Sequence, residues 1–116
     1  MDSEQLAVKL AKVIMKKNGE DVLILDLRGT APCADFFVIT TATSTVHARA
    51  IAEALHDRRE VVGLSLPHHI EGMESAQWIL LDYFDVIVHI FLSDVRRFYG
   101  LERLWGDVPQ KRMKEE

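Results

Sequence analysis

The sequence predicts an α/β (α+β) fold: a single domain in which a mixed five-stranded sheet is flanked by helices. The chain has 116 residues, which is enough for one ordinary domain and too few for two. Almost half of the residues (48%) are apolar and 28% are charged, so the chain can bury a core. Short β-branched runs alternate with segments of helical periodicity, and this interleaving is typical of helices packed on a sheet.

The first third of the chain is predicted to form one helix and two strands. Residues 3–17 have apolar side chains at helical spacing, and Asn18-Gly19 supplies a stop signal for that helix. Residues 21–27 are a continuous apolar run, as is typical of a buried strand. After a loop, the aromatic and β-branched residues of 36–42 indicate a second strand.

The middle of the chain is predicted to contain a helix, a short third strand and a polar loop. Ser44 is suited to cap a helix that runs to about Arg59, and small residues on its apolar face allow close approach to a sheet. Residues 61–67 are compatible with a short strand, and we expect the polar segment 68–72 to form the loop after it.

The strongly apolar run from 78 to 91 predicts the last two strands. Its length and β-branched content suit strands at 78–82 and 85–92, joined as an antiparallel hairpin. The turn falls near Asp82 and Asp85, because aspartate side chains accept bonds from nearby backbone N–H groups in turns. These two carboxylates also argue against a membrane-spanning helix, which carries few charges.

A final helix and a charged tail complete the predicted order. Ser93 can cap a helix at residues 94–105, whose apolar residues share one packing face: Val95, Phe98, Leu101 and Trp105. Residues 1–107 form the folded domain in this interpretation. Residues 108–116 form a charged C-terminal tail, which we expect to fray.

Composition indicates a compartment and sets limits on the partners. The net charge of −4 gives no overall attraction to nucleic acid or anionic lipid. The single cysteine, Cys33, cannot form an internal disulfide, which suits a reducing compartment. The chain opens with acidic residues in a helical pattern, unlike a signal peptide. We therefore expect a cytoplasmic, bacterial protein that does not bind membranes, and a mature organellar chain is the alternative.

Sequence motifs for catalysis, metal binding and phosphate binding are missing. His68, His69 and Glu71 lie close together, but their spacing is not typical of a metal site and the chain has no cysteine pair. No Gly-x-Ser-x-Gly elbow supports Ser44 as a nucleophile, and no glycine-rich phosphate motif is present. The sequence therefore predicts no enzyme, no cofactor and no metal.

His89 is an imidazole in the middle of a predicted strand. Strand alternation places it on the same face as Ile87 and Phe91, and on the opposite face from Val88 and Ile90. The favoured interpretation is a buried, neutral histidine with one satisfied hydrogen bond. A contact with a partner is the alternative.

The segment from 78 to 83 is the sharpest candidate for function. Alternation places three of its residues on one face of the strand: Trp78, Leu80 and Asp82. If the helices cover only the other side of the sheet, this face presents a tryptophan beside a carboxylate, and the turn exposes Tyr83 and Phe84. Trp and Tyr are favoured anchors of protein–protein interfaces, so the residues favour an interaction protein over an enzyme.

Four segments, taken in order, carry a family resemblance. They are ADFFVIT at 34–40, EG at 71–72, WILLDYFDVIVHIF at 78–91 and RRFYGLERLW at 96–105. None is diagnostic alone, but with these separations they resemble the ribosomal silencing factor family, also called the Iojap-like family. The similarity covers about residues 3–107.

The resemblance implies a function that the residues alone do not name. Members bind the large ribosomal subunit on the face that meets the small subunit, where they dock on large-subunit ribosomal protein fourteen. They obstruct subunit joining and so lower translation when nutrients are scarce, and free members are often homodimers. Their fold resembles nucleotidyltransferases without the catalysis. In agreement, the strand-to-helix turn here reads TATS without Gly-Ser, and no Asp-x-Asp pair exists.

Carried over to this chain, the family's interface falls on one set of residues: Trp78, Leu80, Leu81, Asp82 and Tyr83, with His68, Glu71 and Phe84 as neighbours. Phe84 stands where the family usually has Gly in the hairpin turn, so we expect a different local turn or a larger aromatic contact. Arg96, Tyr99 and Glu102 match the final-helix pattern and are interpreted as mainly structural. The acidic side chains suit a basic ribosomal protein, so nucleic acid is not expected as the main contact.

Two other functions compete with silencing. A large-subunit assembly factor would bind through the same residues without repressing translation. A nucleotide-binding enzyme would follow from the fold alone, which is weak evidence of function, and the missing phosphate and metal motifs count against it.

Overall fold

The structure, a computed structural model, describes residues 1–114. In chain order its helices and strands are α1 (Ser3–Lys16), β1 (Glu20–Asp26), β2 (Phe36–Ala42), α2 (Thr45–Leu55), β3 (His69–Glu71), β4 (Trp78–Asp82), β5 (Val86–Leu92), α3 (Ser93–Tyr99), α4 (Leu101–Leu104) and β6 (Gln110–Arg112). The predicted α+β fold with one mixed sheet is confirmed. The described residues form six strands, however, where the sequence predicted five.

The strand order across the sheet is β3-β4-β5-β2-β1-β6, and β2 and β5 pair in parallel at its centre. The remaining neighbours pair antiparallel. The predicted hairpin is confirmed, because β4 and β5 pair antiparallel with Leu80 opposite His89. The central strands are buried along almost their whole length, which explains their continuous apolar runs.

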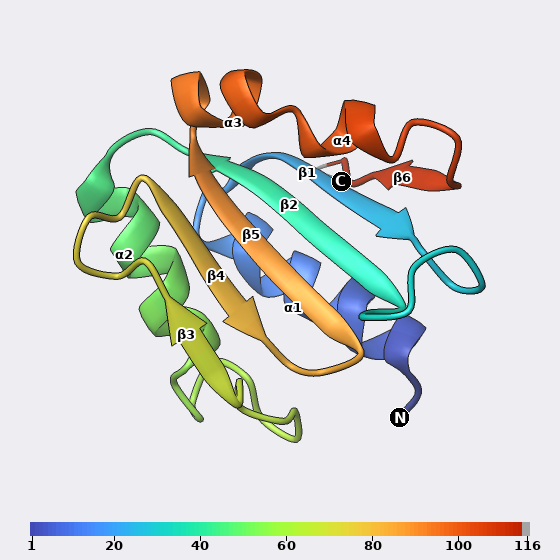
Figure 1. Ribbon diagram of the computed structural model, residues 1–116. Helices are drawn as coiled ribbons and strands as arrows, with labels where there is room; N and C mark the ends of the chain where they lie inside the picture. The colour runs from blue at the N-terminus through green and yellow to red at the C-terminus, as the bar shows by residue number, and fades with distance from the viewer. Residues whose placement is uncertain (115–116) are drawn as a thin grey trace.

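Helices α1 and α2 lie behind the sheet in Figure 1, and the larger core lies between them and the strands. α1 begins at a capping box between Asp2 and Gln5 and buries Leu10 and Ile14 completely. The predicted cap of α2 is confirmed, since the Ser44 side chain accepts from the backbone N–H of His47 at 3.1 Å. Small buried residues on α2 allow close packing on the sheet: Ala48, Ala52 and Ala54.

The opposite face of the sheet is covered only in part. α3 and α4 lie along one side of this face in Figure 1, and no described helix lies over β3 and most of β4. A second core forms under the covered part, around Phe37, Ile39 and Phe91, with Trp105 packed against it. The rest of this face is available for contacts with other molecules.

The third strand lies further along the chain than the sequence predicted. Residues 61–67 contain no strand, because Gly63 adopts a positive φ of 77° and Val62 is 80% exposed. The strand forms instead at His69–Glu71, inside the predicted polar loop, where it pairs with β4. α2 also ends at Leu55 rather than near Arg59.

The predicted final helix is broken into α3 and α4 at Gly100, which adopts the left-handed conformation with φ of 56°. Ser93 does not cap α3 through its side chain; it accepts a bond from Arg97 instead. The break also changes the packing face. Phe98 was predicted to pack with its helix neighbours, but its side chain is 80% exposed.

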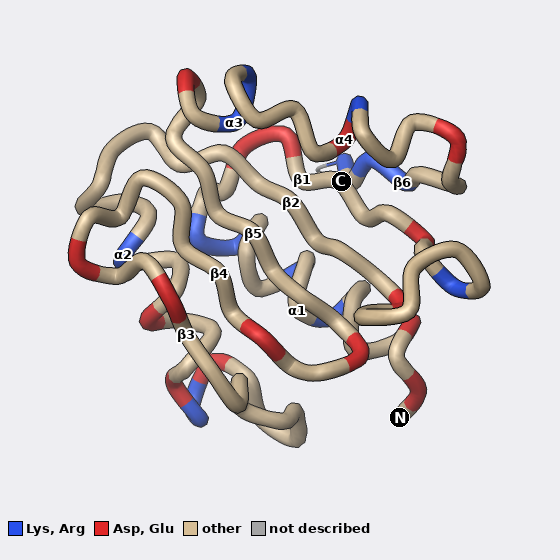
Figure 2. The backbone as a smooth tube through the Cα atoms, in the orientation of Figure 1, with Lys and Arg blue, Asp and Glu red and all other residues tan. Residues whose placement is uncertain are grey.

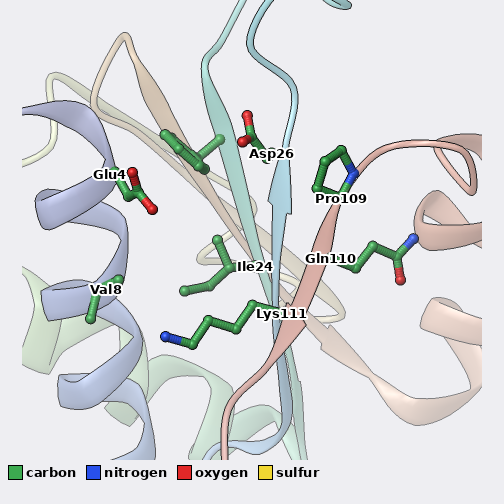
Figure 3. Close-up of a pocket in the computed structure, with 8 residues that line it drawn as sticks. Glu4, Val8, Ile24, Asp26, Pro109, Gln110 and Lys111 are labelled. Atoms are coloured by element: carbon green, nitrogen blue, oxygen red, sulfur yellow. The ribbon is translucent and has the colours of Figure 1, made fainter.

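The predicted fraying of the tail is wrong for residues 110–112. These residues form β6, which pairs antiparallel with β1, and the backbone N–H of Met113 bonds Val22 O at 2.8 Å. A cavity of about 160 Å³ lies between α1 and this edge of the sheet. Figure 3 shows Val8 and Lys111 on its two sides. The tail prediction for residues 115–116 lies outside the described residues.

Within residues 1–114, no helix has the length and apolar character needed to cross a membrane. In the same part of the chain, no three His, Cys, Asp or Glu side chains gather as a metal-binding group.

Candidate partner-binding face

The uncovered part of the sheet brings together most of the predicted contact residues. We name it the open face and define it by the following residues: His68, Glu71, Trp78, Leu80, Asp82, Phe84 and Ile87. The register places Glu71 opposite Leu80, and Ile87 opposite Asp82, so these side chains share one surface of the sheet. The burial pattern along β4 alternates between half-buried and buried residues, which confirms the predicted alternation of this strand.

Trp78 is held at one end of the open face by aromatic neighbours. Its ring centroid lies 4.8 Å from that of Phe91 on β5 and 4.8 Å from that of Tyr99 on α3. Its indole N–H donates to Nδ1 of His89 at 3.1 Å. The side chain is half-buried, so part of the ring faces solvent while its polar atom is engaged within the protein.

His89 lies under the open face with only 4% of its surface exposed. Burial lowers the pKa of His89 to about 4, so the ring is neutral at pH 7. Phe37 packs edge-on against it, with ring centroids 4.6 Å apart. The favoured interpretation of a buried, neutral histidine with one hydrogen bond is confirmed, and Trp78 is the donor of that bond.

Leu81 and Tyr83 do not lie on the open face. Leu81 is fully buried and Tyr83 is 5% exposed, both in the core against the helices. The predicted exposure of Tyr83 at the turn is therefore wrong, because alternation continues past the strand end and places residue 83 on the same side as residue 81. The Tyr83 hydroxyl donates to Leu55 O at 3.5 Å, and burial raises its pKa.

The hairpin turn carries an exposed aromatic stack at one end of the open face. Phe84 is 61% exposed and adopts a positive φ of 70°, a conformation that is uncommon for a bulky residue. Its backbone N–H donates to Oδ1 of Asp82 at 2.7 Å, which closes the turn. The His68 ring stacks on Phe84 with a centroid separation of 3.8 Å. Of the two outcomes expected at this position, the larger aromatic contact is observed.

The open face and its turn are bordered by acidic residues. Acidic residues lie at the end of β3, at the end of β4 and in the hairpin turn, namely Glu71, Asp82 and Asp85, and Figure 2 draws these segments of the backbone in red. Glu71 is exposed and lies 3.1 Å from His69, which carries a positive charge only when protonated. Lysine and arginine residues lie along α1, on and just after α2, on α3 and α4, and on β6, and acidic residues also occur on several of these elements. Among the residues that define the open face, the charged ones are the acidic Glu71 and Asp82.

Sequence reasoning missed two aromatic residues that extend the open face. Phe98 is 80% exposed and Tyr99 is 55% exposed, and together with Trp78 and Val95 they line a groove of about 500 Å³. The residue that could have indicated this exposure is Gly100, because glycine often ends a helix. It ends α3 after seven residues, so the two adjacent aromatics project from a short helix end rather than packing along a long helix.

Arg96 fastens α3 to the body of the sheet, as its structural interpretation predicted. It is 5% exposed and donates to Asp21 O at 2.9 Å, to Oγ1 of Thr41 at 2.8 Å and to Oε1 of Glu102 at 3.0 Å. Charged hydrogen bonds of this kind hold the helix in place beside Trp78.

Comparison with known proteins identifies the family. A family model described as "ribosomal silencing factor during starvation" matches residues 1–116. The chain belongs to this family. A ribosomal silencing factor of Bacillus subtilis is 41% identical over 93 residues, covering 80% of this chain and 78% of that protein. One from Halalkalibacterium halodurans is 37% identical, covering 94% of this chain and 92% of that protein.

More distant relatives and solved structures agree with the family. The chloroplastic Iojap protein of Arabidopsis thaliana is 33% identical over 94% of this chain, which spans 46% of that longer protein. A crystal structure from Chromobacterium violaceum superposes with a TM-score of 0.84 at 26% identity, covering 100% of this chain and 92% of that chain. Another from Bacillus halodurans gives a TM-score of 0.79 at 32% identity, covering 96% of this chain and 100% of that chain.

Family membership assigns the chain to a class of ribosome-associated regulators of translation. The expectation of an interaction protein agrees with that assignment. The open face combines exposed aromatic surface with acidic residues, a combination that suits a macromolecular contact.

Proposed function

We propose that this protein binds the large ribosomal subunit through the open face, docks on large-subunit ribosomal protein fourteen, and thereby blocks association with the small subunit. Translation is lowered in this way when nutrients are scarce, in the bacterial cytoplasm. The observation that carries the proposal is the uncovered part of the sheet in a chain of this family, where the half-buried Trp78 lies on the same strand face as Leu80 and Asp82.

The predicted contact residues divide into two groups in this proposal. Those on the open face touch the partner directly: His68, Glu71, Trp78, Leu80, Asp82 and Phe84. Leu81 and Tyr83 contribute indirectly, because their side chains are buried in the core against the helices and hold β4 and its turn in place. A few residues, tryptophan prominent among them, typically supply most of the binding energy of an interface, so Trp78 is expected to dominate.

Carboxylates suit a basic ribosomal protein as the partner. Glu71 and Asp82 lie on neighbouring strands of the open face, and Asp85 is exposed at the turn. Complementary charges raise the rate of association more than they raise the affinity. The carboxylates therefore guide encounter, while the aromatic surface holds the complex together.

The proposed mechanism is steric and requires no chemistry. The sheet, with a core on each face, makes a domain that occupies space the small subunit needs. Bound in this way, the protein makes or breaks no covalent bond, and its effect depends only on occupancy of the large subunit.

Sedimentation with purified large subunits tests the proposal. The wild type should co-sediment, and Trp78→Ala should lower the affinity at least tenfold while the far-ultraviolet circular dichroism is unchanged. Trp105→Ala is the matched control, because Trp105 is the chain's other tryptophan and packs over the covered part of the sheet. Wild-type protein that stays at the top of the gradient would overturn the proposal.

A second arm adds small subunits to the bound complex. Silencing predicts fewer joined ribosomes as the protein concentration rises, and Trp78→Ala should restore joining. Binding without any effect on joining would favour the assembly-factor function, which uses the same docking surface.

A further inference from the structure

We propose that His89 is a positioning residue: its Nδ1 accepts the indole N–H of Trp78 and so holds that ring in the orientation that the large subunit recognises. The inference rests on the proposed function of the open face. His89 itself is too buried to meet a partner, with 4% of its surface exposed. It acts through Trp78.

The hydrogen bond determines which edge of the indole faces inward. Phe91 and Tyr99 pack on the Trp78 ring with centroids 4.8 Å away, and such packing restricts the plane of the ring. Packing alone does not decide which edge of the ring faces the protein. The bond of 3.1 Å to His89 decides it, because the indole N–H is a donor that needs an acceptor.

The same bond sets the tautomer of His89. A neutral imidazole has one acceptor nitrogen and one donor nitrogen, so acceptance at Nδ1 places the proton on Nε2. Nε2 is buried and has no hydrogen-bond partner among the described residues. A buried polar group without a partner costs stability, and an apolar side chain would avoid that cost. A histidine at position 89 therefore serves to accept the hydrogen bond of Trp78, because it does not add to the stability of the core.

A fixed indole presents a defined surface to the partner. The N–H edge is engaged within the protein, so the partner meets the apolar part of the ring. A contact that is held in place before binding loses less conformational entropy when the complex forms. The recognition chemistry at this position is thus an apolar or aliphatic side chain of the partner against the ring, without a hydrogen bond from the indole.

Two substitutions at position 89 separate the acceptor from the bulk of the side chain. His89→Leu fills the site without an acceptor, whereas His89→Asn places a carbonyl oxygen near the position of Nδ1. The Trp78 indole N–H signal in a ¹H–¹⁵N spectrum, assigned by its loss in Trp78→Phe, reports the bond directly. We expect this signal to shift in His89→Leu and to return toward the wild-type position in His89→Asn. An unchanged signal in His89→Leu would overturn the inference.

Affinity for purified large subunits gives the second readout. His89→Leu should weaken binding about five- to tenfold, the size of effect of one hydrogen bond, and His89→Asn should recover most of it. In a Trp78→Phe background, His89→Leu should change the affinity less than twofold. Equal weakening in both backgrounds, or wild-type affinity in folded His89→Leu, would show that His89 does not act through Trp78.

Thr40→Val is the matched control for stability. Thr40 is a buried polar residue whose hydroxyl donates to Glu20 O at 2.8 Å, on the helix side of the sheet. It should lose stability in urea without losing affinity, whereas His89→Leu should lose affinity without a matching loss of stability. Affinity that simply follows stability in both variants would contradict the positioning role. Because the indole signal needs no ribosome, failure of wild type to bind large subunits would count against the proposed function only.

Discussion

At the scale of single residues, His89 makes the stability of the protein depend on pH. Burial lowers the pKa of its ring to about 4, compared with about 6.5 for an unfolded chain. Above pH 6.5 the ring is neutral in both states and imposes no penalty. Between pH 6.5 and 4 the unfolded state takes up a proton that the folded state does not, so the free energy of unfolding falls with falling pH.

The pH dependence gives a quantitative prediction. From pH 7 to pH 4 the His89 contribution should lower the free energy of unfolding by up to about 3 kcal/mol, the value that corresponds to this pKa difference. His89→Leu should lack this contribution, so urea denaturation at several pH values should give a flatter profile for the variant. Parallel profiles for the two proteins over pH 4–6.5 would contradict the assignment of a buried, neutral ring.

The turn at Phe84 combines a strained backbone with an exposed ring. Phe84→Gly should relieve the positive φ of 70° and change stability by no more than about 1 kcal/mol in either direction, because glycine also loses more entropy on folding. Loss of the ring and of its stack on His68 should nonetheless weaken binding to large subunits. Phe84→Ala removes the ring but keeps the strain, so it should bind as poorly as Phe84→Gly and unfold more easily. Full affinity in both variants would remove Phe84 from the contact surface.

At the scale of elements, the sequence predicted a strand correctly where the strand's own residues show an apolar pattern. The two-residue period of β4 predicted correctly that Trp78 and Leu80 share a face, because alternation needs no knowledge of neighbouring strands. β3 and β6 were missed because each has only three residues, which are exposed or half-buried and therefore show no apolar strand pattern. β3 forms by pairing with the nearby β4, and β6 forms by pairing with β1, far away in sequence. Tyr83 was predicted to be exposed because it lies next to a turn, but its side chain is buried.

β6 also tests where the folded domain ends. Truncation after residue 107 removes the edge strand and Val108, which is 8% exposed in the second core. We expect the free energy of unfolding to fall by about 2 kcal/mol, mainly from the lost burial of Val108, and the bare edge of β1 to promote aggregation. Affinity for large subunits should be retained, because the open face lies at the other edge of the sheet. If the truncated and full chains unfold at the same urea concentration, residues 1–107 are the whole folded domain.

At the scale of the whole molecule, the proposed function relies on two features: one sheet face is only partly covered by helices, and the charged residues on that open face are acidic. One sheet face is covered by α1 and α2, and the other is covered only toward β1 and β6 (Figure 1). The charged residues of the open face, Glu71 and Asp82, are both acidic and Asp85 lies at its turn, while lysines and arginines lie on other elements, which include α1, α2 and β6 (Figure 2). Under the proposed function, the acidic residues of the open face give a basic partner a local attraction that the chain's net charge of only −4 would not supply.

This polarity predicts a difference between two substitutions that change the net charge equally. Glu71→Lys reverses an exposed charge on the open face, and Glu53→Lys reverses one on α2, behind the sheet. Glu71→Lys should slow association with large subunits several-fold and make the association rate less sensitive to salt, while the dissociation rate changes little. Glu53→Lys should leave the association rate within twofold of wild type. Stopped-flow mixing at two salt concentrations separates the cases: equal slowing by both substitutions would mean that overall charge, and not the open face, guides encounter.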